Sequence, residues 1–307
     1  MITIALGDDY AQQRDWKRAF VLYKQVQTVD KMVSLVEKAG TEMVTDGQLL
    51  TLKEWLAALP PNLATSRPSL LSLQAAIMIG TGDVNPGVNL LDEVIARLEE
   101  PGDDIETLAM SLIRRAFAQR SMGHYADAQA DSRRAIDILE NYPEHGLIRA
   151  EAMRISGTTY FYQGELHHAL STLKQSLRLF DSYNDQQNIP KLLFNIGFVN
   201  ASMGNHVQAE IMYRNALSHW QTGGNLAWAA DLLNNLGVLQ QQRGDYETAA
   251  KNFEKAIEYA RISNAPQAEA LSLTSLGDLY RDLDATREAQ DVYKQAQVIA
   301  KQLNDGF

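Results

Sequence analysis

The sequence predicts an all-α fold, a right-handed superhelical solenoid of about eight helical hairpins. Three observations lead to this prediction. A small residue recurs every 40 or 41 positions, a glycine follows it at the expected turn, and apolar residues surround both at three- and four-residue spacing. A small residue lets two helices approach closely, a glycine ends the first helix, and the apolar stripe packs on the next helix.

Six hairpins share this regular register. Their small residues are Ala75, Ala116, Gly157, Gly197, Gly237 and Gly277. The glycines expected at the turns are Gly82, Gly123, Gly164, Gly204 and Gly244. A polar residue follows each of several turns, where the N-terminal cap of a second helix belongs, as at Asp83, Glu165, Asn205 and Asp245. In one first helix the apolar stripe consists of Leu232, Leu233, Leu236 and Leu239.

Two further hairpins fit before the regular ones at shorter spacing. The first is indicated by Gly7, Tyr10, Asp15-Trp16 and Ala19, and the second by Gly40, Gly47 and Leu56. We expect one domain over residues 1–307, with divergent, shorter hairpins in 1–100 and regular 40-residue repeats in 101–307. The connectors are too short for a flexible linker between domains, as at Pro101-Gly102-Asp103-Asp104 and Asn264-Ala265-Pro266.

Composition narrows the functional class. The chain has 307 residues, 28 Lys and Arg against 38 Asp and Glu, and no cysteine. A formal net charge of -10 argues against direct contact with a nucleic-acid backbone. The absence of cysteine excludes a disulfide framework and a thiol nucleophile, and no apolar run is long enough for a membrane span. These features predict a cytoplasmic protein without a membrane anchor.

The repeat signature resembles the tetratricopeptide repeat family over nearly the whole chain. The first third is similar to the start of the sensor region of MalT-type transcriptional regulators, which are LuxR-family STAND ATPases. That likeness rests on Asp15-Trp16-Lys17-Arg18-Ala19, Trp55-Leu56-Ala57-Ala58-Leu59-Pro60 and Arg67-Pro68-Ser69-Leu70. The resemblance implies a P-loop ATPase before the sensor and a helix-turn-helix domain after it.

The sequence contains neither of those two parts. It has no G-x-x-x-x-G-K-[ST] motif, and nothing after the last repeat leaves room for a DNA-binding domain. We therefore expect an excised sensor solenoid, or a separate protein that kept the same repeat type. Both ends lack a polar capping helix, so we expect either that the chain is cut from a longer protein or that its ends pack on something, which includes self-association.

Catalytic chemistry has little support in the sequence. The six histidines show no H-E-x-x-H motif, and the adjacent pair His167-His168 points in two directions on a helix. Gly80-Thr81-Gly82-Asp83 follows a helix and has the register of a hairpin turn, which argues against a phosphate loop. The acid pairs Glu99-Glu100 and Asp103-Asp104 lie in a connector. We predict no catalytic residue, no metal, no cofactor and no enzymatic activity.

A binding groove is better supported, because the resemblance implies that the first helix of each hairpin lines the concave side. Counting back from the small residues gives ten candidates, namely Arg154, Tyr162, Lys191, Phe194, Asn195, Phe198, Asn234, Asn235, Gln242 and Arg281. Asn195 and Asn235 have the family position whose amide commonly bonds the backbone of a bound peptide. An amide suits a peptide unit or a pair of sugar hydroxyls because it donates and accepts at once.

The asparagine and aromatic candidates also have a structural alternative. The asparagines can satisfy a neighbouring helix end, and Phe161, Tyr162, Phe194 and Phe198 can belong to the core instead of stacking on a ligand. Two functional hypotheses remain. The first is a sensor or interaction module of a bacterial transcriptional regulator, with an inducer, a peptide or a partner protein in its groove. The second is a stand-alone scaffold for assembling protein complexes.

Overall fold

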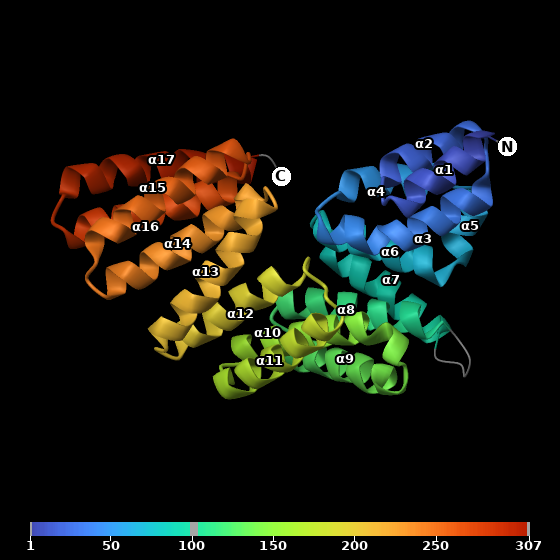
Figure 1. Cartoon of the computed structure of the whole chain (residues 1–307), viewed down its shortest axis with the longest axis horizontal. Helices are drawn as coiled ribbons and strands as arrows, with labels where there is room; N and C mark the ends of the chain where they lie inside the picture. The colour runs from blue at the N-terminus through green and yellow to red at the C-terminus, as the bar shows by residue number, and fades with distance from the viewer. Residues whose placement is uncertain (1, 99–103, 306–307) are drawn as a thin grey trace. The chain divides into compact units, whose positions relative to one another are not determined.

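The computed structural model describes residues 2–98 and 104–305. Within these residues the chain is helical and contains no strand, and consecutive helices form hairpins along the whole length (Figure 1). The predicted all-α class and the repeated hairpin arrangement are therefore confirmed. The acid pair Glu99-Glu100, the connector Pro101-Gly102-Asp103 and the last residues Gly306 and Phe307 lie outside the described residues.

The chain divides into two compact units, Met1–Thr159 and Tyr160–Phe307, so that the boundary falls within one helix. The expectation of one domain over 1–307 stays a prediction. Helices of the first unit are α1 (Ile2–Gln12), α2 (Trp16–Gln25), α3 (Val29–Thr45), α4 (Leu49–Ala57), α5 (Pro61–Ser66), α6 (Pro68–Gly80), α7 (Val84–Arg97), α8 (Ile105–Ser121), α9 (Tyr125–Ile138), the short 3-10 helices η1 (Leu139–Asn141) and η2 (Pro143–His145), and most of α10 (Gly146–Tyr162).

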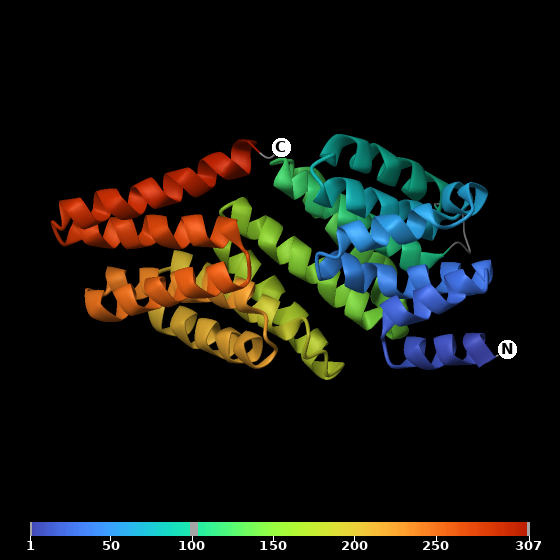
Figure 2. The same ribbon diagram turned by 90° about the horizontal axis from the view of Figure 1, so that it is seen from above.

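The second unit continues with three complete hairpins after α11. Its helices are α11 (Leu166–Ser182), α12 (Ile189–Ser202), α13 (His206–Thr222), α14 (Leu226–Gln242), α15 (Tyr246–Ile262), α16 (Pro266–Asp282) and α17 (Thr286–Asp305). Within this unit consecutive hairpins lie side by side in chain order (Figure 2), and the first helices α14 and α16 contact each other directly.

One contact recurs between the two helices of a hairpin. A Cβ atom at Gly237 would lie 2.5 Å from a ring carbon of Phe253, so only a glycine lets α14 and the ring of α15 approach this closely. Four hairpins show the same pairing at a spacing of sixteen residues, namely Gly7 with Tyr23, Gly197 with Tyr213, Gly237 with Phe253 and Gly277 with Tyr293. The predicted close approach of the helices at the small residue is confirmed in these hairpins.

The turns between paired helices follow the prediction with two exceptions. The glycines expected at these turns have positive φ, as does Gly47. They are Gly82, Gly123, Gly164, Gly204 and Gly244. The first and last hairpins turn at Arg14 and Asp284 instead, with φ of 57° and 58°. After the turn, Asp245 accepts a hydrogen bond from the Thr248 amide at 3.2 Å. Asp83, Glu165 and Asn205 have the N-cap position without such a side-chain bond.

Apolar stripes from both helices of each hairpin form the core. The predicted stripe on α14 is buried, and its residues are Leu232, Leu233, Leu236 and Leu239. In the first unit the rings of Phe20 and Trp55 stack with centroids 4.3 Å apart, inside a core built from α2, α3, α4 and α6. The described residues include no helix that is long and apolar enough to cross a membrane.

We predict that Gly237→Ala lowers the free energy of unfolding by about 1–2 kcal/mol, because the new methyl group meets a rigid ring in a packed core. Gly80→Ala is the matched control. Its Cβ atom would meet the flexible end of Leu49, so we expect a change within about 0.5 kcal/mol. Urea unfolding followed by circular dichroism measures both. Equal effects of the two substitutions would contradict the role given to the ring of Phe253.

Candidate functional site

The ten predicted site residues fall in both units. Arg154 belongs to the first unit, and the other nine belong to the second. In the second unit Lys191, Phe194, Asn195 and Phe198 lie on α12. The remaining residues lie on α10, α14 and α16, and they are Tyr162, Asn234, Asn235, Gln242 and Arg281. All ten lie on the first helices of their hairpins, and their role in binding stays a prediction.

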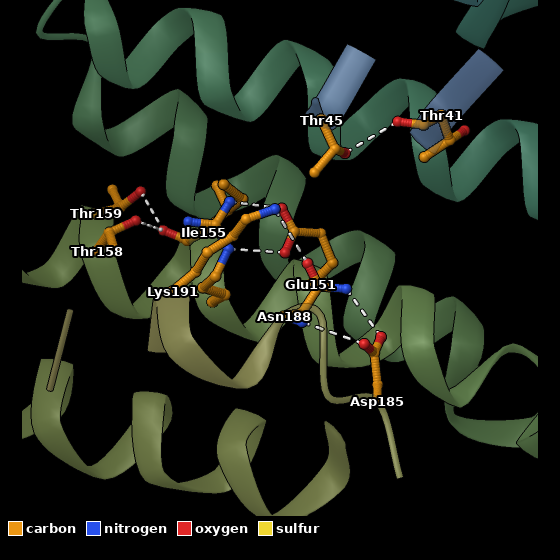
Figure 3. A network of polar contacts seen from close by, with 10 residues as sticks. Thr41, Thr45, Glu151, Ile155, Thr158, Thr159, Asp185, Asn188 and Lys191 are labelled. Carbon is orange, nitrogen blue, oxygen red and sulfur yellow. Dashed lines mark hydrogen bonds and ion pairs between the residues drawn. The ribbon is translucent and has the colours of Figure 1, made fainter. Parts of the chain in front are cut away.

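Arg154 forms an ion pair with a residue on its own helix, Glu151. Its Nε and Nη2 atoms donate to the two carboxylate oxygens of Glu151 at 2.7 and 2.6 Å. Burial disfavours the charged guanidinium, but the Glu151 carboxylate outweighs it and raises the pKa of Arg154. One turn further along, the hydroxyls of Thr158 and Thr159 both donate to the Ile155 carbonyl (Figure 3). The Arg154 charge is thus already balanced.

Seven aromatic side chains of the second unit form a continuous cluster, which we call the aromatic cluster. Phe194 is its centre, with ring centroids 6.3 Å from Phe198, 6.1 Å from Tyr213 and 6.3 Å from Trp228. Phe161 lies 5.0 Å from Phe198 by the same measure. The members of the cluster are Phe161, Tyr162, Phe194, Phe198, Tyr213, Trp220 and Trp228.

The aromatic cluster is part core and part surface. Tyr213 and Trp220 are buried, whereas Tyr162 is 56% exposed, Phe198 39% and Trp228 37%. The buried rings therefore belong to the core, and the exposed rings are open to contact with a ligand. Sequence reasoning missed Trp220 and Trp228, although their centroids stack 5.1 Å apart. They lie outside the first-helix positions counted from the small residue, at the end of α13 and the start of α14.

Two asparagines of the second unit carry buried polar atoms that have no hydrogen-bond partner. These atoms are Nδ2 of Asn195 and Oδ1 of Asn234. Asn235, in contrast, donates from Nδ2 to the Asp231 carbonyl on its own helix at 3.0 Å. A buried amide without a partner costs about 1–3 kcal/mol, so such groups commonly indicate a functional constraint.

Asp231 adds a desolvated carboxyl group to the same face of α14. Burial raises its pKa to about 6, and among the described residues its carboxylate has no hydrogen bond or ion pair. Residues three or four positions apart share a helix face, so Asp231 lies beside Trp228, Asn234 and Asn235. Because α12 and α14 meet through Phe194 and Trp228, aromatic and polar groups are combined on this surface.

The other three candidates do not belong to the aromatic cluster. Lys191 donates to Oδ1 of Asn188 at 3.4 Å, and Asn188 donates to Asp185 at 2.8 Å (Figure 3). Arg281 is 63% exposed and donates to Asp278 at 2.8 Å, on its own helix. Gln242 is exposed at the last residue of α14. In the described part of the chain, no group of three or more His, Asp or Glu residues is placed to hold a metal ion.

This arrangement of hairpins has a match among known protein families. A model of the tetratricopeptide repeat matches residues 106–182, 188–262 and 229–302, which together make up more than half of the chain. The chain belongs to the tetratricopeptide repeat family, as its repeat signature predicted. It is therefore a helical-repeat module of the kind used for protein interaction.

Individual proteins share the repeats at low identity. Protein kinesin light chain-related 3 of Arabidopsis thaliana is 25% identical over 169 residues, which are 53% of this chain and 25% of that protein. The chain thus spans about a quarter of the length of this relative.

Solved structures share the fold, and two of them match nearly the whole of this chain. A STAND (signal transduction ATPase with numerous domains) protein with a tetratricopeptide repeat sensor, from Pyrococcus horikoshii, has a TM-score of 0.71 and 16% identity. The match covers 96% of this chain and 47% of that one. A Rap protein complexed with competence and sporulation factor has a TM-score of 0.66 and 14% identity, covering 99% and 98% of the two chains. These likenesses show the fold alone.

We predict that Asp231→Asn stabilises the protein at pH 7 by about 1–2 kcal/mol. The pKa of Asp231 is about 6 in the folded chain and about 3.9 in an unfolded chain, so between these values the folded state binds more protons. The free energy of unfolding of the parent therefore falls as pH rises from about 4 to about 6, and Asn removes this loss.

Urea unfolding of parent and variant at pH 4 and pH 7 measures the effect. We expect the difference between them to shrink towards pH 4. Asp291→Asn, at an exposed position of α17, is the control and should change stability by less than about 0.5 kcal/mol. A pH-independent difference for Asp231→Asn would rule out the proposed titration.

Proposed function

We propose that the second unit binds an extended peptide or partner segment along the first helices α12 and α14, and that the chain is the sensor module of a bacterial transcriptional regulator. The observation that carries this proposal is the pair of buried amide atoms without partners, Nδ2 of Asn195 and Oδ1 of Asn234. One is a donor and the other an acceptor. A peptide backbone offers the complementary acceptor and donor along a single chain.

The aromatic cluster supplies the apolar part of such a site. Tyr162, Phe198 and Trp228 keep large parts of their surfaces open to solvent, while the buried rings beneath them hold their positions. Rigid aromatic side chains give large contact areas at low cost in conformational entropy. A ligand side chain packed on these rings would add affinity, and the asparagines would fix the direction of its backbone.

The regulatory role is supported by resemblance. The first third of the chain is similar to the sensor region of MalT-type regulators, and the STAND protein from Pyrococcus horikoshii has a tetratricopeptide repeat sensor with this fold. The Rap protein was solved in complex with competence and sporulation factor. In such a regulator the inducer, whether a peptide or a small molecule, shifts the population between two states, and another domain contacts the DNA. The module then works in the cytoplasm.

We predict that Asn195→Leu and Phe198→Ala each weaken ligand binding at least about tenfold, because each removes a contact near the centre of the site. A peptide library displayed on phage is selected against the full chain, and isothermal titration calorimetry then measures the selected peptide. Asn215→Ala is the matched control, because Asn215 is exposed on the second helix α13. We expect this substitution to change the affinity for the peptide by less than about twofold.

Asn195→Leu also tests the structural alternative. If Asn195 supported a helix end, its loss would destabilise the free protein, whereas removing an unpartnered amide is expected to leave stability unchanged or raise it. Selected peptides that bind the parent and both site variants equally would overturn the proposal, and so would a selection that yields no binder. The stand-alone scaffold would then be favoured.

The regulatory context has a separate test in the encoding reading frame. We expect a P-loop motif upstream of these residues and a helix-turn-helix segment downstream, in the order of the MalT-type regulators. Sequencing the flanking DNA checks this directly. A frame without both segments would contradict the regulator assignment and leave the peptide-binding surface as a separate question.

A further inference from the structure

Two adjacent arginines of the first unit have opposite environments. Arg115 on α8 donates to both carboxylate oxygens of Asp131 at 2.7 Å and to Asp92 at 2.6 Å. The hydrogen bonds to Asp131 raise the pKa of Arg115. Its charge is therefore fully balanced by two acids on α7 and α9. Arg114, the residue before it, points to another surface and has no such acid.

Arg114 makes its hydrogen bonds to neutral hydroxyl groups. Its Nη1 atom donates to the hydroxyl of Ser72 on α6 at 2.6 Å, and its Nη2 atom donates to the hydroxyl of Thr41 on α3 at 3.1 Å. Ser72 is itself hydrogen-bonded to Ser111 of α8 at 2.8 Å, in the interior. Three first helices, α3, α6 and α8, thus hold one guanidinium group in a fixed orientation.

This cation has no counter-ion among the described residues. Burial lowers the pKa of Arg114 to about 10, and no carboxylate acts to raise it again. Hydroxyl groups orient a guanidinium, but they carry no net charge to compensate the loss of solvation. Arg114 is half-buried, and its hydrogen bonds join α8 to α3 and α6. Its unpaired charge itself adds no stability, because no carboxylate offsets the lost solvation.

The arrangement leaves hydrogen-bond donors available. A guanidinium carries five N–H groups, and the contacts to Ser72 and Thr41 use two of them. Thr41 is exposed, and its hydroxyl accepts from Arg114, so its own hydrogen is available to a ligand. The chain around Thr41 is held by Thr45, whose hydroxyl donates to the Thr41 carbonyl at 2.9 Å (Figure 3).

Further along α8 the same face offers more contacts. Phe117 follows Arg114 by three residues and is 42% exposed. The Arg120 guanidinium lies over its ring, 5.2 Å from the centroid. A ligand that neutralised Arg114 would therefore meet the ring of Phe117 within about one helical turn, and the Arg120 guanidinium lies on the far side of that ring, nearly two turns from Arg114.

We propose that the first helices α3, α6 and α8 form a binding site for an oxyanion, a carboxylate or phosphate group, with Arg114 and the Thr41 hydroxyl as its donors. Guanidinium groups bind both kinds of oxyanion through paired N–H donors. The site lies entirely in the first unit and does not depend on the ligand proposed for α12 and α14. It gives this chain a second recognition element, selective for negative charge despite its own net charge of -10.

Thermal unfolding of the full chain tests the site, with disodium glutarate, sodium phosphate and sodium chloride compared at matched ionic strength. The variants are Arg114→Met, which keeps the length but removes the charge, and Arg97→Gln as the control, since Arg97 is an exposed arginine of α7. We expect glutarate or phosphate to raise the midpoint of the parent and of Arg97→Gln by about 2 °C or more above chloride. Arg114→Met should lose this increment.

The anion-free midpoint is the second readout. If Arg114 is a ligand-binding residue, Arg114→Met should unfold at the same temperature as the parent or higher. A larger increment with glutarate assigns a carboxylate ligand, and a larger one with phosphate assigns a phosphate group. The proposal is overturned if Arg114→Met unfolds several degrees lower and responds to anions as the parent does, or if neither anion exceeds chloride in the parent.

Discussion

The contact between a glycine of the first helix and the ring sixteen positions later sets the geometry of four hairpins. At Gly7, Gly197, Gly237 and Gly277 the partner is a ring, because the missing Cβ leaves room for its edge. At Ala75, Ala116 and Gly157 the residue at that spacing is Leu91, Ser132 or Leu173, none of which has a ring. In four hairpins the ring therefore matches the space left by the glycine. This matching keeps the hairpins alike, so that they stack at a regular period.

Regular stacking has a consequence for the first helices. The second helices bury rings and apolar residues against their partners, and the apolar stripes of the first helices do the same. The polar positions on the first helices are then held on rigid elements. Asn195, Asn234 and Asp231 in the second unit and Arg114 in the first are such groups. The proposed binding functions follow from polar groups fixed in place by the packing of their own helices.

The sequence predicts the fold well where the structural signal is local. The eight hairpins, the glycine turns and the buried stripe on α14 all depend on residues less than about 20 positions apart. It is insufficient where a contact joins distant residues. Trp228 contacts Phe194 of the preceding repeat, and Arg114 donates a hydrogen bond to Thr41, which lies 73 positions earlier in the chain. No pattern within a single repeat therefore predicts the aromatic cluster or the unpaired Arg114. The predicted site residues lie on the expected helices, but only the structure separates the paired Arg154 from the unpartnered Asn195.

If the second unit presents its first helices to a ligand, binding should protect the backbone of those helices. Hydrogen–deuterium exchange of the full chain, with and without a peptide selected for binding, measures this protection. We expect slower amide exchange in α12 and α14 on binding, with exchange in the second helices α13 and α15 little changed. Protection confined to α13 and α15 would show that the ligand binds the opposite face of the repeats, and would overturn the proposed site.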